Sequence, residues 1–585
     1  MGCAMVNHQT DLNSLSIAIT GSGGAGVITA GNMLLEAAAR AGLYGLFMRS
    51  SGPQIRGGEA AAMVRLGTGP VDAPGEEFHI LIAIDWHNID RFAIELPLSS
   101  DSLVIADPAQ GDVPQVISAS GARIVELPLK QMAKAIPKGR ANMIALGALA
   151  KLIGLPADAV DGILEKVLKK RAAEALESSR AAIAAGAAAA GDIKFAYALS
   201  MPIAAPDKRW MISGNEATGM GAVRGGVRFV AAYPITPATE VLEWLSPALK
   251  KVGGALVQAE DELASINMII GASYGGTPSL TATSGPGLAL MLESIGLAVA
   301  SEIPIVVVDV MRGGPSTGIP TKSEQSDLNI AVFGLHGDAP HIVVAPTSVA
   351  DCLFASQWAV HLAEVLQVPA IVLSDQMLGQ TRAIIDQPPD LAFVSRRVLA
   401  EAEISDYHRY ALASGGVSPM TLPGRAGGQY TADGLEHNEF GDPSSQVTDH
   451  VAQLDKRSNK ISEYDFGDHW AEIEGDGDLA VITWGSSTGV VREALRELSV
   501  KGRSIRLIAP RLLAPASPAR MANALAGVER ALIIELSHSG QFYHYLKGYF
   551  ELPCPVASYC RAGPLPYRAA ELVSQIENWS ESPLS

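Results

Sequence analysis

Residues 228–237 read Arg-Phe-Val-Ala-Ala-Tyr-Pro-Ile-Thr-Pro, a short apolar run that ends in a turn fixed by two prolines. The apolar part, Arg228–Ala232, predicts a buried strand, and helical stretches separate it from further strands of the same kind. Strands that alternate with helices predict a parallel sheet covered on both faces. Ligands bind beyond the carboxyl ends of such strands, so we expect this turn to border a site and Thr236 to offer a hydroxyl there.

The same reasoning divides the whole chain. We expect an α/β fold with three doubly wound parallel-sheet domains, at residues 1–195, 205–395 and 473–585. The first ends in an Ala-rich stretch, 172–190, whose composition suits an exposed helix or a linker. Residues 396–472 are rich in Gly, Asp, Ser, His and Tyr, and we expect an ordered arm or lid there rather than a merely flexible linker. The other strands predicted in the second domain are Leu256–Gln258, Ser279–Ala282, Ile305–Val310, Ile342–Ala345 and Ala370–Ser374.

Composition excludes several classes of protein. Of the 585 residues, 48% are hydrophobic and 18% charged, which is ordinary for a globular chain and excludes a disordered or collagen-like one. The formal net charge of −17 argues against non-specific binding to nucleic acid or to an anionic membrane surface. No apolar stretch approaches the ~18 residues that span a bilayer. The first residues also lack the blocks of a signal peptide, so we expect a cytoplasmic protein.

Cysteine is scarce, with four residues and no C-x-x-C pair. Cys554 and Cys560 lie too far apart for a local zinc or iron–sulfur signature. We therefore expect reduced thiols, no iron–sulfur cluster in this chain and no metal site.

A glycine-rich loop opens the first domain. Gly21, Gly23 and Gly26 match G-x-G-x-x-G between a predicted strand and a predicted helix. A dinucleotide site also requires an acidic residue after the second strand, which here ends in Arg-Ser-Ser at residues 49–51, so NAD is disfavoured. Two interpretations stay open: backbone N–H groups that hold another phosphate-bearing ligand, and a purely structural turn. A second glycine-rich loop adds Arg56 as a partner for phosphate or carboxylate.

Three further strand ends in the second domain carry reactive or flexible residues. Glu260-Asp261-Glu262 begins a helix, where the helix dipole alone could account for the acids. Thr-Ser-Gly-Pro-Gly at 283–287 follows the predicted strand Ser279–Ala282. Arg312 follows the predicted strand Ile305–Val310 and begins a run to Thr321 that is rich in glycine and hydroxyl groups. The carboxyl ends of parallel strands share one edge of a sheet, so these segments predict a site.

These segments resemble those of a known family. Tyr-Pro-Ile-Thr-Pro at 233–237, Ala-Glu-Asp-Glu-Leu-Ala at 259–264, Thr-Ser-Gly-Pro-Gly at 283–287 and Arg-Gly-Gly-Pro-Ser-Thr-Gly-Ile-Pro-Thr at 312–321 are similar to the 2-oxoacid:ferredoxin oxidoreductases. The first domain resembles their gamma component, and residues 210–570 resemble their alpha component. Within the family the chain looks most like the 2-oxoglutarate type (2-oxoglutarate synthase).

The resemblance implies a fused gamma–alpha subunit whose domains are gamma-type, pyrimidine-binding-type and transketolase C-terminal-like. It implies thiamine diphosphate with Mg²⁺, shared with a beta subunit that holds the diphosphate and a 4Fe-4S cluster. It also implies coenzyme A as a substrate, ferredoxin as the electron acceptor and a dimer of heterodimers. Alternatives are a pyruvate or other 2-oxoacid enzyme, and a non-catalytic partner that kept a thiamine-enzyme-like fold.

The resemblance also implies residue roles. Glu262, or else Glu260, would activate the coenzyme, while Thr236, Arg312 and Thr321 would bind the 2-oxoacid. The residues on the thiamine side would be Tyr233, Pro234, Ile235, Ser284, Gly285 and Gly287, and those on the coenzyme A side Gly21, Gly23, Gly26 and Arg56. For the distal carboxylate of 2-oxoglutarate, Arg224, Arg228, His336 and a residue of the beta subunit stay open.

Overall fold

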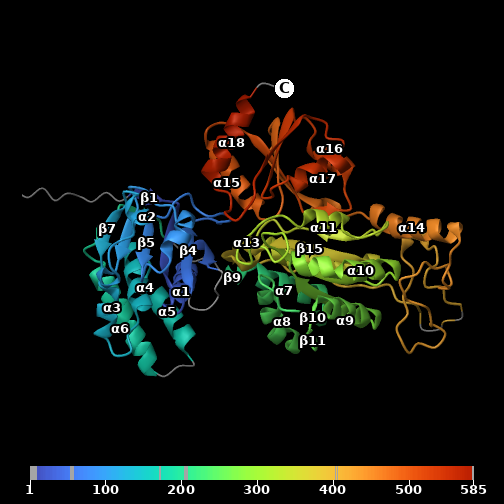
Figure 1. The fold of residues 1–585 in the computed structure, drawn as a ribbon, viewed down its shortest axis with the longest axis horizontal. Helices are drawn as coiled ribbons and strands as arrows, with labels where there is room; N and C mark the ends of the chain where they lie inside the picture. The colour runs from blue at the N-terminus through green and yellow to red at the C-terminus, as the bar shows by residue number, and fades with distance from the viewer. Residues whose placement is uncertain are drawn as a thin grey trace, which may run out of the picture. The chain divides into compact units, whose positions relative to one another are not determined.

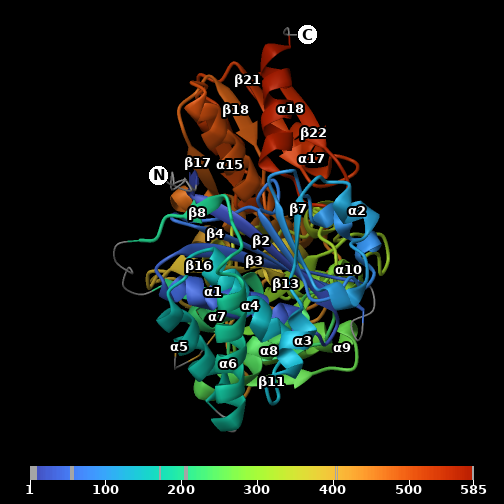
Figure 2. The same cartoon turned by 90° about the vertical axis from the view of Figure 1, so that its left-hand side faces the viewer.

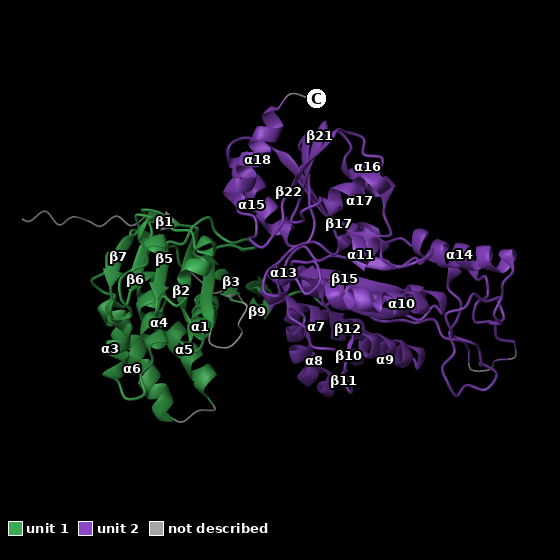
Figure 3. Ribbon diagram, in the orientation of Figure 1, with its two compact units in different colours: residues 1–212, 381–389 green, residues 213–380, 390–585 purple. Residues whose placement is uncertain are grey.

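A computed structural model describes residues 10–582 except 53–57, 170–172, 203–208, 402–403 and 405. The chain forms two compact units, shown in green and purple in Figure 3. Unit 1 comprises residues 1–212 and 381–389, and unit 2 comprises residues 213–380 and 390–585. Within the described ranges, no helix has both the length and the apolar character needed to cross a bilayer.

Unit 1 is built on an eight-stranded sheet in the order β7-β6-β5-β2-β4-β3-β16-β9. Strands β2, β5, β6 and β7 run parallel, as expected, but β4 pairs antiparallel with both β2 and β3. The sheet is therefore mixed. Its strands are β2 (Ser14–Ser22), β3 (Tyr44–Ser51), β4 (Glu59–Gly67), β5 (Ile80–Ala83), β6 (Leu103–Ala106), β7 (Arg123–Glu126), β9 (Arg209–Ser213) and β16 (Arg382–Asp386), with a separate pair of β1 (Thr10–Leu12) and β8 (Tyr197–Leu199).

The Ala-rich stretch near the end of the first domain, expected as an exposed helix or a linker, is a helix that packs along one face. This helix, α6 (Ala173–Ala189), lies against α4 so closely that a side chain at Gly147 or Gly186 would overlap a backbone carbonyl of the opposite helix. Small residues permit this approach, which explains the composition. Figures 1 and 2 show α6 beside α4. The other helices are α1 (Val27–Arg40), α2 (Gln115–Ser118), α3 (Leu129–Lys134), α4 (Ala141–Leu152) and α5 (Ala157–Leu168).

Unit 2 contains a seven-stranded sheet in the order β11-β10-β12-β13-β15-β14-β20, parallel except for β20. Every strand expected there is present: β10 (Phe229–Ala232), β11 (Ala255–Gln258), β12 (Ser279–Thr283), β13 (Ile305–Met311), β14 (Ile342–Val344) and β15 (Pro369–Asp375), joined by β20 (Leu512–Ala514). The connecting helices are α7 (Gly214–Gly225), α8 (Thr239–Lys251), α9 (Glu262–Tyr274), α10 (Gly285–Ala300), α11 (Leu328–Phe333), α12 (Asp351–Leu366) and α13 (Gln376–Gln380). Strands β13 and β15 are buried throughout, as continuous apolar strands of parallel sheets are.

The C-terminal part of unit 2 has a five-stranded sheet in the order β17-β19-β18-β21-β22, with β17 antiparallel at one edge. Helices α15 and α18 lie on one side of it and α16 and α17 on the other (Figure 1), so this sheet is doubly wound as expected. The elements are β17 (Ala471–Glu474), β18 (Leu479–Ile482), β19 (Ile505–Pro510), β21 (Arg530–Glu535), β22 (Val556–Cys560), α15 (Ser487–Val500), α16 (Pro518–Ala524), α17 (Gln541–Tyr549) and α18 (Ala569–Glu581).

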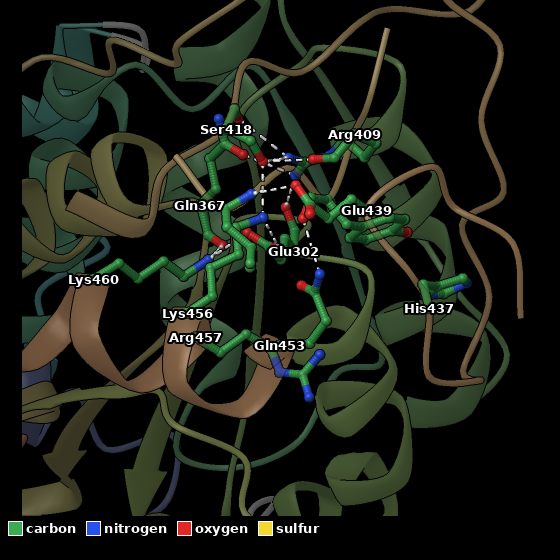
Figure 4. A network of polar contacts seen from close by, with 12 residues as sticks. Glu302, Gln367, Arg409, Ser418, His437, Glu439, Gln453, Lys456, Arg457 and Lys460 are labelled. Carbon is green, nitrogen blue, oxygen red and sulfur yellow. Dashed lines mark hydrogen bonds and ion pairs between the residues drawn. The ribbon is translucent and has the colours of Figure 1, made fainter. Parts of the chain in front are cut away.

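The segment before this sheet has little regular structure apart from α14 (Val447–Ser462), and we call residues 406–462 the arm. A buried carboxylate beyond the end of α10, Glu302, joins the arm to the rest of unit 2 (Figure 4). Its two oxygens lie 2.7 and 2.9 Å from the Nζ atoms of Lys456 and Lys460. Arg409 donates to the backbone oxygen of Glu302 at 2.8 Å, so the arm is attached through charge as well as through packing.

This network contains more positive than negative side chains, because one carboxylate faces three cations. Burial alone would raise the pKa of Glu302, but Lys460, Lys456 and Arg409 hold it well below its usual value. Burial lowers the pKa of Lys456 to about 8, against the attraction of Glu302. Because buried cations need a counter-charge, the attachment of the arm depends on Glu302.

The substitution Glu302→Gln tests this dependence. We expect it to lower the free energy of unfolding by about 3 kcal/mol or more, because three buried cations then face a neutral amide. It should also speed protease cleavage within the arm. Thermal unfolding and limited proteolysis measure both effects, with Asp455→Asn, an exposed change on α14, as the matched control. Equal behaviour of the two variants would contradict the role of Glu302.

Candidate functional site

The turn after β10 is fixed by its neighbours. The amide of Asn215, on α7, donates to the Pro237 oxygen at 2.8 Å. The oxygen of Ile235 accepts the N–H groups of Ala238 and Thr239, which begin α8. Thr236 is therefore held half-buried at the carboxyl end of β10. The other turn residues differ in exposure, since Pro234 and Ile235 are half-buried and Tyr233 is 41% exposed.

The three acids at the start of α9 have different environments. Asp261 caps the helix, because its Oδ1 accepts the N–H of Ala264 at 2.7 Å. Glu260 and Asp261 are exposed, whereas Glu262 is buried at 8% exposure. The dipole explanation therefore suffices for the exposed acids, while the carboxylate of Glu262 lies inside the protein.

Glu262 meets the glycine-rich turn after β12. A Cβ atom built on Gly287 would lie only 2.9 Å from Glu262 Oε1 and would overlap Thr283 Oγ1. A Cβ on Gly285 would lie 2.5 Å from Asp327 Oδ2. The N-terminus of α10 thus lies beside two carboxyl groups, which its dipole stabilises when they are ionised. Beside them, Ser284 is fully buried and its Oγ has no hydrogen-bond partner among the described residues.

Arg312 follows β13 and lies beside the first turn. Its side chain is buried, and Nη1 donates to the backbone oxygen of Thr236 at 2.5 Å. Nε is buried and has no partner in the part of the chain that the structure describes. Burial lowers the pKa of Arg312, and Asp327 and Asp309 oppose that shift. A guanidinium with an unpartnered edge is suited to grip a planar carboxylate.

The loop that begins at Arg312 folds back and is anchored to the C-terminal sheet. Its first part is closed by the Ile319 N–H, which donates to Gly313 O at 2.7 Å, and Thr321 lies half-buried just beyond. Gln325 donates to Trp484 O at 2.7 Å and accepts the N–H of Leu536 at 2.7 Å. Sequence reasoning missed Gln325, because a lone glutamine in a loop carries no periodicity or motif that marks its partners.

Two cations considered for a distal carboxylate lie elsewhere. Arg228 precedes β10 and donates to the backbone oxygens of Val223 and Val227. Arg224 pairs with Asp390 at 3.2 Å. Both lie at the amino end of β10, whereas Thr236 follows its carboxyl end, so the structure does not bring them to the site.

Contacts within unit 1 account for some of the glycines in its glycine-rich loop. Gly26 has φ of +84°, and a side chain there would overlap Asn142, whose amide donates to Gly26 O at 3.1 Å. The Gly23 N–H donates to Gly58 O, and Ser22 Oγ donates to Asp85. A Cβ on Gly21 would press against Val27 at 3.1 Å. These contacts favour a tight turn.

Arg56 lies outside the described residues. Among the described residues, no group of three or more His, Cys, Asp or Glu side chains could hold a metal ion. The cysteines described there, Cys352, Cys554 and Cys560, are free.

Two family models of known proteins match this chain. Residues 220–456 match the family model described as "Pyruvate flavodoxin/ferredoxin oxidoreductase, thiamine diP-bdg". Residues 16–189 match the one described as "Pyruvate ferredoxin/flavodoxin oxidoreductase". The first match contains all four strand ends described above.

Two relatives and one solved structure are similar over long stretches. The alpha subunit of 2-oxoacid:ferredoxin oxidoreductase 1 from Sulfurisphaera tokodaii is 35% identical over 58% of this chain, and the chain spans only 57% of that protein. The 2-oxoglutarate synthase subunit KorA of Methanothermobacter marburgensis is 34% identical over 57% of this chain and 90% of its own length. The 2-oxoglutarate:ferredoxin oxidoreductase from Magnetococcus marinus, solved with 2-oxoglutarate, coenzyme A and succinyl-CoA bound, has a TM-score of 0.90 and 35% identity, with coverage of 97% of this chain and 99% of that one.

The contact between Glu262 and the glycine turn can be tested with two alanine substitutions in α10. Gly287→Ala should cost about 1–3 kcal/mol of stability, because the added methyl group displaces Thr283 or Glu262. Gly296→Ala, where a Cβ would meet nothing within 4 Å, should be neutral or stabilising by up to ~1 kcal/mol. Thermal unfolding of both variants measures the difference, and a stable Gly287→Ala protein would refute the close contact.

Proposed function

The chain belongs to the 2-oxoacid:ferredoxin oxidoreductase family, and on that premise we propose that it is a fused gamma–alpha subunit of the 2-oxoglutarate type. The reaction is the reversible conversion of 2-oxoglutarate, coenzyme A and oxidised ferredoxin into succinyl-CoA, carbon dioxide and reduced ferredoxin. The observation that carries this proposal is the convergence of Glu262, Arg312 and Thr236 at one edge of the sheet. The likeness to the Magnetococcus marinus enzyme supports 2-oxoglutarate as the substrate.

The residues at this edge fit one half of a thiamine diphosphate site. Glu262 offers a buried carboxylate, and Ser284 offers a buried hydroxyl that has no partner among the residues the structure describes. Gly285 and Gly287 keep the turn free of side chains, while Tyr233, Pro234 and Ile235 form the adjoining turn. When bound, thiamine diphosphate supplies a nucleophilic carbon and an electron sink for loss of carbon dioxide.

Glu262 would hold and exchange a proton at its carboxylate, as the residue that faces the aminopyrimidine of thiamine diphosphate in this proposal. Its position at the N-terminus of α9, against the start of α10, keeps it out of bulk water. A fixed, buried acid–base group is what proton transfer at the coenzyme requires. Glu260 is the exposed alternative and lacks this environment.

Arg312 and Thr236 bind the 2-oxo-carboxylate in this proposal. Arg312 has its Nη1 on the Thr236 backbone, which leaves its Nε edge for a planar anion. Thr236 adds the hydroxyl of the rigid turn whose backbone oxygen accepts from Arg312. Thr321 adds a hydroxyl from the anchored loop. The residue that binds the distal carboxylate is then His336 or belongs to the partner, since Arg224 and Arg228 lie at the other end of β10.

The partner in this proposal is a beta subunit that holds the diphosphate, Mg²⁺ and a 4Fe-4S cluster and passes electrons to ferredoxin. Exposed apolar side chains near the site support a docked partner. They lie on β11, α9 and α10: Val257 at 37%, Leu263 at 50%, Met268 at 42% and Leu290 at 53% exposure. We propose a dimer of such heterodimers, in the cytoplasm, with coenzyme A contacting the loop that carries Gly21, Gly23 and Gly26.

A proton-transfer role for Glu262 predicts a clear difference between two neighbouring variants. Glu262→Gln should lower kcat by about 10²-fold or more with an unchanged thermal midpoint, because an amide cannot exchange the proton. Glu260→Gln, the matched control in the same segment, should retain near-normal kcat. Steady-state assays of the coexpressed complex with a viologen dye measure both. The reverse ranking would transfer the role to Glu260.

The substrate can be tested with a panel of 2-oxoacids on the same complex. We expect 2-oxoglutarate to have the highest kcat/KM, and Arg312→Lys to raise its KM by about tenfold or more because a point charge cannot replace the bidentate grip. A preference for pyruvate would change the subtype within the family. An isolated chain that oxidises 2-oxoacids without its partner would contradict the shared site.

A further inference from the structure

The loop that follows Arg312 ends against the C-terminal sheet of unit 2. The residues that contact it come directly after β18, β21 and β22, three parallel strands that are neighbours in that sheet. Helix α15 leads from β18 to β19 on one side, and α17 leads from β21 to β22 on the other, so the strand order reverses between β18 and β21. The carboxyl ends of the strands at such a reversal are where open α/β sheets bind their ligands.

A side chain of this chain itself, that of Gln325, lies at this point. It is fully buried, and its Nε2 donates to Trp484 O at 2.7 Å. Its Oε1 accepts the N–H of Leu536 at 2.7 Å and the hydroxyl of Ser487 at 2.9 Å. The backbone N–H of Gln325 also donates to Leu536 O at 2.8 Å. An amide fits this place because the partners require a donor and an acceptor from one side chain.

The C-terminal domain returns the contact through a second glutamine. Gln541 is the first residue of α17, and its Nε2 donates to Ser326 O at 2.8 Å. Its Oε1 accepts the N–H of Asn329 at 2.9 Å. The fully buried carboxylate of Glu535 accepts two N–H groups in the first turn of α17, each at 2.8 Å, and so fixes the helix end that carries Gln541. The two glutamines therefore hold neighbouring residues of one loop from opposite sides.

The segment that they hold lies beside both ends of the run from Arg312 to Thr321. Ser326 Oγ donates to Arg312 O at 3.4 Å. The N–H of Gly313 donates to the backbone oxygen of Lys322, the residue after Thr321, at 3.0 Å. A shift of residues 323–326 would therefore move the backbone of Arg312 and of Thr321 together.

The chemistry of the contact favours positioning over simple attachment. Apolar packing would be enough to join two domains, and it tolerates sliding because it has no direction. Hydrogen bonds of an amide weaken steeply when distance or angle changes, so they select one position of the loop. Each buried partner that loses its amide would also be left unsatisfied, which makes other positions costly.

We propose that Gln325 and Gln541 are positioning residues that clamp the loop from Arg312 to Thr321, so that both groups meet the 2-oxoacid in one fixed geometry. The proposal rests on the proposed role of Arg312 in binding substrate. It gives the C-terminal domain an effect on substrate affinity, which it exerts through the loop.

Hydrogen exchange tests the clamp without reference to activity. In Gln541→Ala and in Gln325→Ala, we expect peptides that cover residues 313–322 to exchange about tenfold faster or more, because the N–H groups of Ile319 and Lys322 lose their fixed partners in the loop. The matched control is Gln357→Ala. Gln357 is a buried glutamine on α12 that donates to two backbone oxygens of residues 391–393, so its loss should lower the thermal midpoint and leave exchange in the loop unchanged. Unchanged exchange in both clamp variants would overturn the proposal.

Kinetics of the coexpressed complex test the effect on the substrate. We expect Gln541→Ala and Gln325→Ala to raise the KM for the 2-oxoacid by about tenfold or more, with the KM for coenzyme A within about twofold of wild type. Gln325→Glu should have the same effect, because it places an oxygen against Trp484 O. Gln357→Ala should change neither KM. If Gln325→Ala does not fold, the half-buried Gln541 still provides the test, and a wild-type KM in Gln541→Ala would refute the proposal.

The failure of this proposal can be distinguished from that of the proposed function. If Arg312→Lys raises the KM for the 2-oxoacid and the glutamine variants do not, the substrate site stands and only the clamp is refuted. If Arg312→Lys leaves the KM for every 2-oxoacid unchanged, Arg312 does not bind substrate, and the clamp loses its role together with that site.

Discussion

The chemistry that unit 2 can perform depends on one geometric constraint, the alignment of parallel strands. Strands β11, β10, β12 and β13 are neighbours, so their carboxyl ends share one edge of the sheet. That edge brings Glu262, Thr236, Ser284 and Arg312 together although they span much of the second domain. The segments that follow these strands are short turns fixed by proline, glycine or helix caps, and this rigidity gives each functional group a defined position.

The strands and motifs that could be predicted from the sequence are those that a local pattern of residues determines. Apolar runs predicted β10 to β15, and their flanking motifs predicted the segments at the sheet edge. Sequence reasoning missed β4, whose Ala-rich sequence resembles a helix. For α6 it left an exposed helix and a linker open, because small residues suit both exposure and close helix packing. It also could not find Gln325, because its partners Trp484 and Leu536 are distant in the sequence and a single amide in a loop gives no signal of its neighbour.

Buried charge recurs in unit 2, with a different consequence at each place. Glu302 is surrounded by cations and attaches the arm. Arg511 is held by Asp351 and Glu472, which joins the C-terminal sheet to the region of α12. Arg312 is buried, and its Nε has no hydrogen-bond partner within the described part of the chain. The first two groups attach neighbouring segments through ion pairs, whereas the guanidinium of Arg312 contacts a backbone oxygen.

Two sheets of this chain contain strands that are synthesised much later than the rest of the sheet. The sheet of unit 1 includes β16, residues 382–386, which are synthesised after most of the second domain. The sheet of the second domain is completed by β20, residues 512–514, which come from the C-terminal domain. Neither sheet can therefore finish folding as its own residues emerge. During translation both sheets keep an open edge of unpaired backbone groups until these strands have been made.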